Sequence, residues 1–298
     1  MTKIKTYMDY LRHERNYSRH TEISYFTDLC QFEEYIRGLE PEFDPEQIDA
    51  DMIRRWVVSL AESGVSPRSI GRKLSGVKSF YRYLLEHGFV SHNPAKSVKA
   101  PKTGKPLPSF VNYGDMKSIL DSCKGIPEGS NEFESMRNHL IVELLYLTGM
   151  RREELVKLKD SDVDYSAQLI LVNGKRNKQR LIPISNALAQ AIREYQHIRN
   201  RDVTRETDNL FVLETGKPVY PMLIYRIVHR SLEHIATLGK ASPHVLRHSF
   251  ATGMLNHGAE INSVKELLGH SSLASTEVYT HTSVEELKKI YDKAHPRG

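Results

Sequence analysis

Apolar residues recur at helical spacing through the first hundred residues of this 298-residue chain. Candidate caps at Ser18 and Asp49 precede the first two apolar stripes, and the third segment starts near Ser66 with Pro67 at its first turn. The stripes themselves are Tyr25, Leu29, Phe32 and Ile36, then Ile53, Trp56, Val57 and Leu60, then Ile70, Leu74, Val77, Tyr81 and Leu84. No strand pattern interrupts this region, so we expect a helical N-terminal domain.

Prolines then break the helical pattern. They stand at Pro94, Pro101, Pro106 and Pro108, with Gly104 among them. Such a stretch is typical of a linker between domains. We therefore expect a first domain at 1–99, a linker at 100–109 and a second domain at 110–298.

The second domain combines helical stretches with one short strand pair. Residues 169–172 and 180–184 are apolar and strand-like, and Asn173-Gly174 between them is a turn signal, so a β-hairpin is expected. The predicted helices cover 136–148, 186–198, 222–235, 244–256, 261–268 and 284–293. The fold expected is mainly α with a small β-sheet, a mixed α/β unit following a helical one.

Composition narrows the cellular setting. Hydrophobic residues make up 39% and charged residues 27%, as in ordinary globular proteins. The longest apolar run, 140–147, contains Glu143 and is too short to span a membrane. The N-terminus has no apolar signal-peptide core, and the two cysteines have no metal-ligand spacing. We expect a cytoplasmic protein with no membrane partner.

Positive charge is concentrated near the linker. The chain has a net charge of +5, and residues 66–108 hold nine basic residues against one acidic residue, Glu86. A basic helix running into a basic linker suits a DNA phosphate backbone, although a solvated helix face is the alternative. The candidate DNA contacts on this helix are Arg68, Arg72, Lys73, Lys78 and Arg82.

The second domain holds an ordered set of polar residues that fits phosphodiester chemistry. In chain order the set is Arg151, Lys175, His244, Arg247, His270 and Tyr279. Attack on a phosphodiester needs cations to offset the charge that develops on the phosphate oxygens. The chain shows no metal-binding motif, so fixed guanidinium groups are expected to supply that charge, without a metal or other cofactor.

Arg151 and Arg247 are the candidate phosphate clamp. His244 lies three residues before Arg247, which places both on one face of a helix, and Pro243 suits the start of that helix. Arg152 follows Arg151 directly and is the alternative clamp residue if the register is shifted by one.

Tyr279 is the candidate nucleophile. A phenol has a pKa of about 10, so its proton must leave during attack. His270 would follow a helix that ends at Gly269, where an imidazole can donate to a phosphate oxygen or move a proton. Lys175, in the hairpin turn, is the candidate general acid for the departing sugar oxygen.

Four motifs resemble those of the tyrosine recombinase (phage integrase) family, most closely its Xer branch. LTGMRREEL is similar to the first-arginine box and NGKRNKQRLIP to the β-hairpin lysine box. HVLRHSFAT is similar to the His-x-x-Arg box, and LLGHSSLASTEVYTH to the box with the histidine and the nucleophile. The resemblance assigns Arg151, Lys175, His244, Arg247, His270 and Tyr279 as the catalytic residues.

The resemblance also implies an architecture and partners. It implies a helical core-binding domain and a catalytic domain that close round double-stranded DNA as a C-shaped clamp. Four protomers, of this chain alone or with a second recombinase, would act on inverted-repeat half-sites, and a DNA translocase is a further candidate partner. The C-terminal helix would dock into a neighbouring protomer through Val284, Leu287 and Ile290.

Three other functions remain open at this point. An integrase of a mobile element would use the same chemistry, but no additional N-terminal arm-binding domain precedes the helical unit, which favours the Xer type. A DNA-binding protein without catalysis would not need a phenol together with two arginines. A type IB topoisomerase-like enzyme would relax DNA without exchanging strands.

Overall fold

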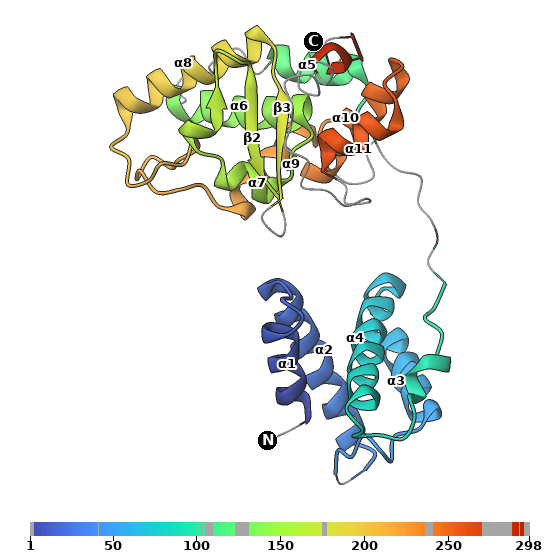
Figure 1. The fold of residues 1–298 in the computed structure, drawn as a ribbon. Helices are drawn as coiled ribbons and strands as arrows, with labels where there is room; N and C mark the ends of the chain where they lie inside the picture. The colour runs from blue at the N-terminus through green and yellow to red at the C-terminus, as the bar shows by residue number, and fades with distance from the viewer. Residues whose placement is uncertain are drawn as a thin grey trace. The chain divides into compact units, whose positions relative to one another are not determined.

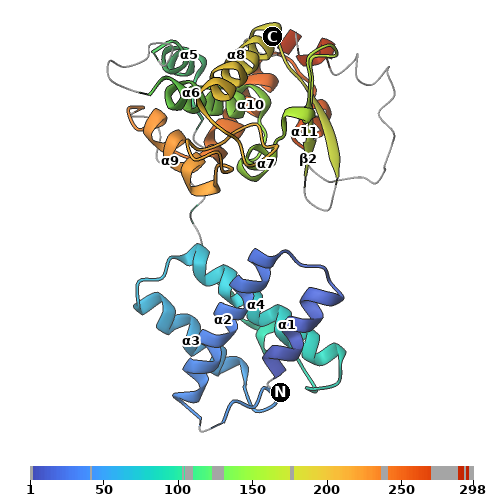
Figure 2. The same ribbon diagram turned by 90° about the vertical axis from the view of Figure 1, so that its left-hand side faces the viewer.

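The chain divides into two compact units, Met1–Pro106 and Leu107–Gly298 (Figures 1 and 2). The structure is a computed structural model. It describes residues 3–40, 42–102, 104, 110–122, 131–174, 178–235, 241–269, 288–291 and 293–294. Within these residues, no helix is both long enough and apolar enough to cross a lipid bilayer.

The first unit is helical, as predicted. Its elements are α1 (Lys3–His13), α2 (Arg19–Arg37), α3 (Ala50–Glu62), α4 (Pro67–Glu86) and a short 3-10 helix, η1 (Pro94–Ser97). The predicted caps at Ser18 and Asp49 are confirmed, because each side chain accepts a backbone N–H from the first turn that follows. Ser66, where a helix was predicted to start, caps α4 in the same way.

The core of this unit is rich in aromatic side chains. Phe32 and Trp56 pack edge to face with ring centroids 4.9 Å apart, and Tyr7 lies 5.4 Å from Phe80 in the same way. Tyr7, which is fully buried, donates its hydroxyl to Ser79 at 2.8 Å. Burying large aromatic surface stabilises a small helical bundle, and a partner for the hydroxyl removes the cost of burying it.

The second unit is mixed α/β, with one three-stranded antiparallel sheet of order β1-β2-β3. Its elements are α5 (Tyr113–Ser122), α6 (Glu132–Thr148), α7 (Arg152–Lys157), η2 (Asp160–Asp162), β1 (Val163–Asp164), β2 (Leu169–Asn173), β3 (Gln179–Pro183), α8 (Asn186–Asp202), α9 (Pro221–Leu232), α10 (Pro243–Asn256) and α11 (Ile261–Leu268). The predicted hairpin is confirmed as β2 and β3. The strand β1 was not predicted, because two residues are too few to show an alternating pattern.

Helix α6 forms the centre of the second unit, in contact with α8, α9 and α10 (Figure 1). Its apolar residues are buried around most of its circumference, including Leu140, Ile141, Leu144 and Leu145. A helix with apolar residues around most of its circumference is a buried helix, as the sequence indicated. Helix α6 ends at Thr148, and Gly149 follows it in the left-handed conformation with a positive φ of 59°.

A second apolar cluster of this unit joins α10 and α11 with residues near the end of the chain, at 290, 291 and 294. Phe250, Met254 and Leu267 pack there with Tyr291, which is fully buried and donates its hydroxyl to the carbonyl of Leu147 at 3.1 Å. Ile290, predicted to dock into a neighbouring protomer, is partly buried against this cluster of its own chain. The other two residues of that predicted stripe, at 284 and 287, lie outside the described residues.

Candidate catalytic site

Three arginines converge on the carboxyl end of α11. The last carbonyl groups of a helix have no helical partner and carry partial negative charge, so they attract cations. Arg180 donates to the carbonyl of Leu267 at 2.7 Å, Arg247 to Leu268 at 2.6 Å, and Arg151 to Gly269 at 3.3 Å. The segment that continues from Gly269 begins with His270. The arginines therefore surround the point where the nucleophile motif begins.

Arg247 is held from two sides. It lies on α10, where Pro243 occupies the first turn as predicted, and its second guanidinium nitrogen donates to the carbonyl of Gly149 at 2.7 Å. Partial burial, together with the charges of Arg151 and Arg180, lowers the pKa of Arg247 to about 10. The guanidinium therefore remains charged at neutral pH.

Glu154 orients two of these arginines. It accepts from the backbone N–H and the side chain of Arg151, both at 2.7 Å, which fixes the start of α7. Its two carboxylate oxygens also accept from Arg180 at 3.0 and 2.8 Å. Burial raises the pKa of Glu154, but the hydrogen bonds and charges of Arg180 and Arg151 outweigh that effect and lower it. Glu154 is thus a carboxylate that links the first-arginine motif to strand β3.

Arg180 was missed in the sequence analysis. It is only 4% exposed, although it is charged and stands in a strand. Its alternation with Ile182, which is also buried, is a signal in the sequence, because residues two apart in a strand point to the same face. A charged residue on the buried face of a strand indicates a buried partner.

The two neighbouring candidates for the clamp differ in their surroundings. Arg151 lies within the arginine cluster through Glu154 and Gly269. Arg152 pairs at 2.9 Å with Glu153, whose side chain is 52% exposed. This placement favours Arg151 over Arg152 as the clamp residue.

His244 lies beside the cluster at the start of α10. Partial removal from water lowers its pKa, and the charges of Arg152, Arg247 and Arg151 lower it further. The imidazole is therefore neutral at pH 7, a form that can accept a proton or a hydrogen bond. Three predicted residues, Arg151, His244 and Arg247, thus lie close to one another.

The other three predicted catalytic residues, Lys175, His270 and Tyr279, lie outside the described residues. The chain just before two of them adjoins the arginine cluster. A Cβ atom built on Gly174, which precedes the predicted lysine, would lie 3.7 Å from a carboxylate oxygen of Glu154. A Cβ atom on Gly269 would lie 3.2 Å from Cδ of Arg180. The lysine motif and the nucleophile motif therefore both continue from residues that adjoin Glu154 and Arg180.

The candidate DNA contacts on α4 are not all alike. Arg68, Arg72 and Arg82 are exposed, and Lys78 is half-buried. The structure corrects the placement of Lys73, which is 8% exposed and directs its ammonium group to Asp28 at 3.2 Å. Its position next to the apolar stripe of α4 turns it towards α2, so it does not suit a phosphate contact.

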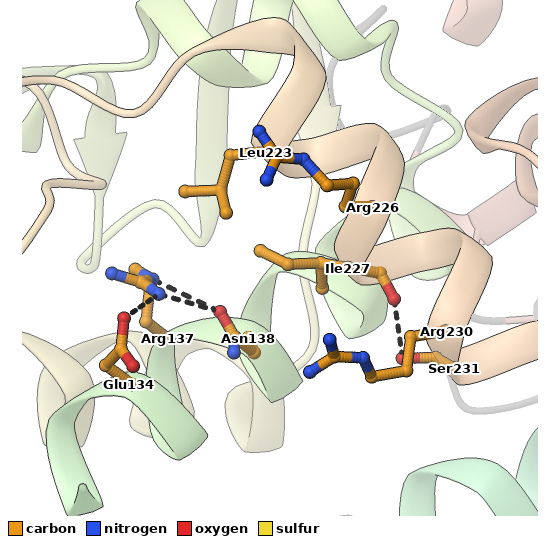
Figure 3. A pocket seen from close by; sticks show the side chains of 8 residues that line it. All are labelled: Glu134, Arg137, Asn138, Leu223, Arg226, Ile227, Arg230 and Ser231. Carbon is orange, nitrogen blue, oxygen red and sulfur yellow. Dashed lines mark hydrogen bonds and ion pairs between the residues drawn. The ribbon is translucent and has the colours of Figure 1, made fainter.

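A separate hollow of about 230 Å³ lies between α6 and α9 (Figure 3). Arg226 and Arg230 reach over it from α9, with Ile227 between them, and Arg137 and Asn138 lie opposite on α6. The buried guanidinium of Arg137 is bonded to Glu134, Asn138 and the carbonyl of Val212. None of the three described catalytic candidates lines this hollow. The described residues also contain no group of three or more His, Cys, Asp or Glu side chains placed to hold a metal ion.

Family models match both units of the chain. The model described as phage integrase family matches residues 110–286, and the model described as phage integrase, N-terminal SAM-like domain, matches residues 4–88. A tyrosine recombinase XerC of Chlorobaculum parvum is 37% identical over 315 residues, covering 98% of this chain and 94% of that protein. The tyrosine recombinase XerC of Bacillus subtilis is 34% identical over 300 residues, covering 99% and 96%.

Solved structures share the fold. The XerH site-specific recombinase, bound to a palindromic difH substrate in a post-cleavage complex, has a TM-score of 0.72 at 24% identity and covers 92% of this chain and 80% of that chain. The Tn1549 transposon integrase in complex with circular intermediate DNA has a TM-score of 0.70 at 22% identity, covering 96% and 98%. The matched family models, the full-length relatives and the arrangement of the arginine motifs agree, and the chain belongs to the phage integrase family of tyrosine recombinases.

Proposed function

We propose that the protein is a site-specific DNA recombinase that cuts and rejoins DNA through a covalent 3′-phosphotyrosyl intermediate, in chromosome dimer resolution. The observation that carries this proposal is the meeting of Arg151 and Arg247 at the end of α11, where the His270 and Tyr279 motif begins. The relatives that bear the name XerC match nearly the whole chain, which supports the choice of the Xer role.

Arg151 and Arg247 bind the scissile phosphate in this scheme. A guanidinium can donate two parallel hydrogen bonds to phosphate oxygens and keeps its charge near neutral pH. The carbonyl groups that each arginine contacts, at Gly269 and at Gly149 and Leu268, fix the two guanidinium groups before DNA arrives. Such pre-organised charge stabilises a phosphoryl-transfer transition state without reorganisation during the reaction.

Tyr279 attacks the phosphorus atom through its hydroxyl oxygen. The new bond joins that oxygen to phosphorus, and the bond between phosphorus and the 5′ sugar oxygen breaks. The product is a 3′-phosphotyrosyl linkage with a free 5′-hydroxyl group, and the reverse reaction with another 5′-hydroxyl group rejoins DNA. Bond energy is kept in the linkage, so the sequence of steps needs no external energy source.

Two protons must move during cleavage. The lowered pKa of His244 favours its neutral imidazole at pH 7, and this form can accept a hydrogen bond or the tyrosine proton. Lys175 supplies a proton to the 5′ sugar oxygen as it departs. His270 donates a hydrogen bond to an oxygen of the same phosphate that Arg151 and Arg247 bind.

The first unit is proposed to hold the DNA. With domain limits of 1–99 and 110–298, the two domains would close as a C-shaped clamp round double-stranded DNA with inverted-repeat half-sites. The exposed arginines Arg68, Arg72 and Arg82 are the proposed phosphate contacts, with Lys78 beside them. A tetramer with itself or with a second recombinase, assisted by a DNA translocase, would carry out strand exchange in the cytoplasm.

Covalent capture from fragmented host DNA tests this function. Wild-type protein is expected to form denaturation-resistant adducts at one short inverted-repeat chromosomal locus, and Tyr279→Phe is expected to form none. Adducts at the boundary of a mobile element would favour an integrase instead. Relaxation of plasmids without a specific site would favour a topoisomerase-like enzyme. Tight binding without any adduct would overturn the catalytic proposal.

A further inference from the structure

Asp28 on α2 is a buried carboxylate that faces two cations of α4. Its side chain is 1% exposed. Both terminal guanidinium nitrogens of Arg72 donate to it, Nη2 to Oδ1 at 2.9 Å and Nη1 to Oδ2, and Lys73 donates to Oδ1 at 3.2 Å. Lys73 also donates to Gln31, one turn further along α2. The catalytic scheme makes no use of this network.

The two cations have different surroundings. The side chain of Lys73 is only 11% exposed, so it acts as the buried counter-charge of Asp28. The side chain of Arg72 is 47% exposed and therefore reaches solvent while its fork grips the carboxylate. With two cations for one anion, the network keeps positive charge on the outer face of α4.

The carboxylate also fixes the plane of the Arg72 guanidinium. A guanidinium has five N–H donors in one rigid plane, and a two-point contact with a carboxylate leaves the other donors for a second anion. Helices α2 and α4 approach closely here, since a Cβ atom on Gly76 would lie 3.9 Å from Cβ of Asp28. The Arg72 guanidinium is thus hydrogen-bonded to a residue on a closely packed helix, so it is less mobile than a free surface side chain.

We propose that Asp28 is a positioning residue for DNA binding, which presents Arg72 to a phosphate of the DNA backbone. This inference rests on the proposed function, because it assumes that α4 meets DNA. Pre-organisation lowers the conformational entropy that a long side chain loses on binding, so a fixed Arg72 binds a phosphate more tightly than a mobile one.

For the DNA affinity of Asp28→Asn, positioning by Asp28 and net charge predict opposite changes. Asp28→Asn makes the protein more positive, and charge alone would then strengthen its binding to DNA. Loss of the fixed fork would weaken binding instead. The matched control is Glu34→Gln, which removes one exposed carboxylate from the same helix and leaves Arg72 in place.

The experiment measures the dissociation constant of the full-length protein for duplex DNA over a series of salt concentrations. Asp28→Asn is expected to bind roughly tenfold more weakly, as for loss of one charge-assisted hydrogen bond. The slope of log K against log salt should become shallower by about 0.9, the value for one lost phosphate contact. Arg72→Gln should show the same changes, and the two substitutions together should add little further. Glu34→Gln should bind as tightly as wild type or more tightly.

Two further variants separate positioning from folding. Asp28→Asn leaves buried Lys73 without its counter-charge, so Asp28→Asn/Lys73→Met removes both charges and is expected to restore the melting temperature but not DNA affinity. Arg72→Lys keeps the charge at an exposed position and loses the planar fork, and it should match Arg72→Gln.

Wild-type affinity and slope in Asp28→Asn/Lys73→Met, or in Arg72→Lys, would overturn the proposal. If covalent capture by the wild-type protein is normal, that result would leave the recombinase function intact. Absence of both DNA binding and covalent capture in the wild-type protein would instead refute the proposed function.

Discussion

Arg180 and Glu154 form a doubly hydrogen-bonded ion pair in which each side chain is only 5% exposed. The pair joins strand β3 to the start of α7, and Arg180 continues to the carbonyl of Leu267 at the end of α11. One buried carboxylate therefore links the hairpin, the first-arginine motif and the end of α11, from which the chain continues to the proposed nucleophile, Tyr279.

Glu154→Gln should destabilise the second unit strongly. It leaves Arg180 buried without its counter-charge, and removal of one partner of a buried pair costs about 3–5 kcal/mol. Urea unfolding of the full-length protein measures the loss. Glu153→Gln is the control, because that side chain is 52% exposed and its loss should cost less than about 0.5 kcal/mol. Equal losses in the two variants would contradict this role for Glu154.

The double variant Glu154→Gln/Arg180→Met separates stability from catalysis. Replacing both charges by uncharged side chains should recover much of the free energy of unfolding, since buried pairs contribute little net stability. Cleavage of a nicked DNA substrate should remain slow, because Arg151 would still lack the carboxylate that orients it. Recovery of both properties would mean that Glu154 does not position Arg151.

The same ion pair predicts an acid-labile stability. The pKa of Glu154 is lowered in the folded protein, so the unfolded chain takes up this proton first as the pH falls. The stabilisation is complete above the unfolded-state pKa of about 4.3 and is lost as the pH falls towards the folded-state value. In urea titrations, the stability difference between wild type and Glu154→Gln should be constant above about pH 5.5 and should shrink below about pH 4. A difference that grows in acid would contradict the assignment.

His244 should set an acid limb on the cleavage rate. Its pKa lies below the ordinary 6.5, so the reactive neutral form predominates at pH 7 and is lost only at lower pH. Arg152→Gln removes one of the charges that lower this pKa, so the limb should move to higher pH. Single-turnover cleavage of a nicked substrate across pH measures it. Arg193→Gln, at an exposed arginine that packs over Tyr165, is the control and should leave the limb unchanged. A limb that stays fixed in Arg152→Gln would exclude His244 as its source.

Gly149→Ala should damage both packing and catalysis. The added Cβ would lie 2.6 Å from the ring of Phe250 and 2.9 Å from Leu268, at a φ of 59°. The left-handed conformation costs about 1–2 kcal/mol for a residue with a Cβ, and overpacking adds about 1–3 kcal/mol. Because the carbonyl of Gly149 accepts from Arg247, cleavage should also slow.

The control for this substitution is Gly258→Ala. Gly258 has a positive φ of 87° and open space around the position of a Cβ, so it should show only the conformational cost. Thermal unfolding and single-turnover cleavage compare the two variants. If both lose the same stability and cleave at the same rate, the contacts of residue 149 with Phe250, Leu268 and Arg247 contribute neither to stability nor to cleavage.

Local features of the fold could be predicted from the sequence because their causes are local. A cap at Ser18 or Asp49 bonds to the backbone two or three residues away, and the two short apolar runs at 169–172 and 180–184 each form a strand of the hairpin. The motifs that contain Arg151 and Arg247 could also be recognised, because each motif is a short run of neighbouring residues.

Long-range pairing could not be predicted in the same way. Glu154 and Arg180 come from different elements, and only the folded sheet brings them together. Lys73 was assigned by its charge, although its place beside Leu74 on α4 turns it inward, and Asp28 on α2 decides its role. The concentration of charge in the sequence thus identified α4 as a basic helix, but not which of its cations remain at the surface.

Cleavage by Tyr279 would leave a covalent linkage to DNA on that residue, which can be identified chemically. Protein trapped on a nicked duplex would be digested with protease and nuclease, and the modified peptide identified by mass spectrometry. We expect a nucleotide joined through its 3′-phosphate to Tyr279, and no adduct in Tyr279→Phe. An adduct on another residue, or continued cleavage by Tyr279→Phe, would contradict it.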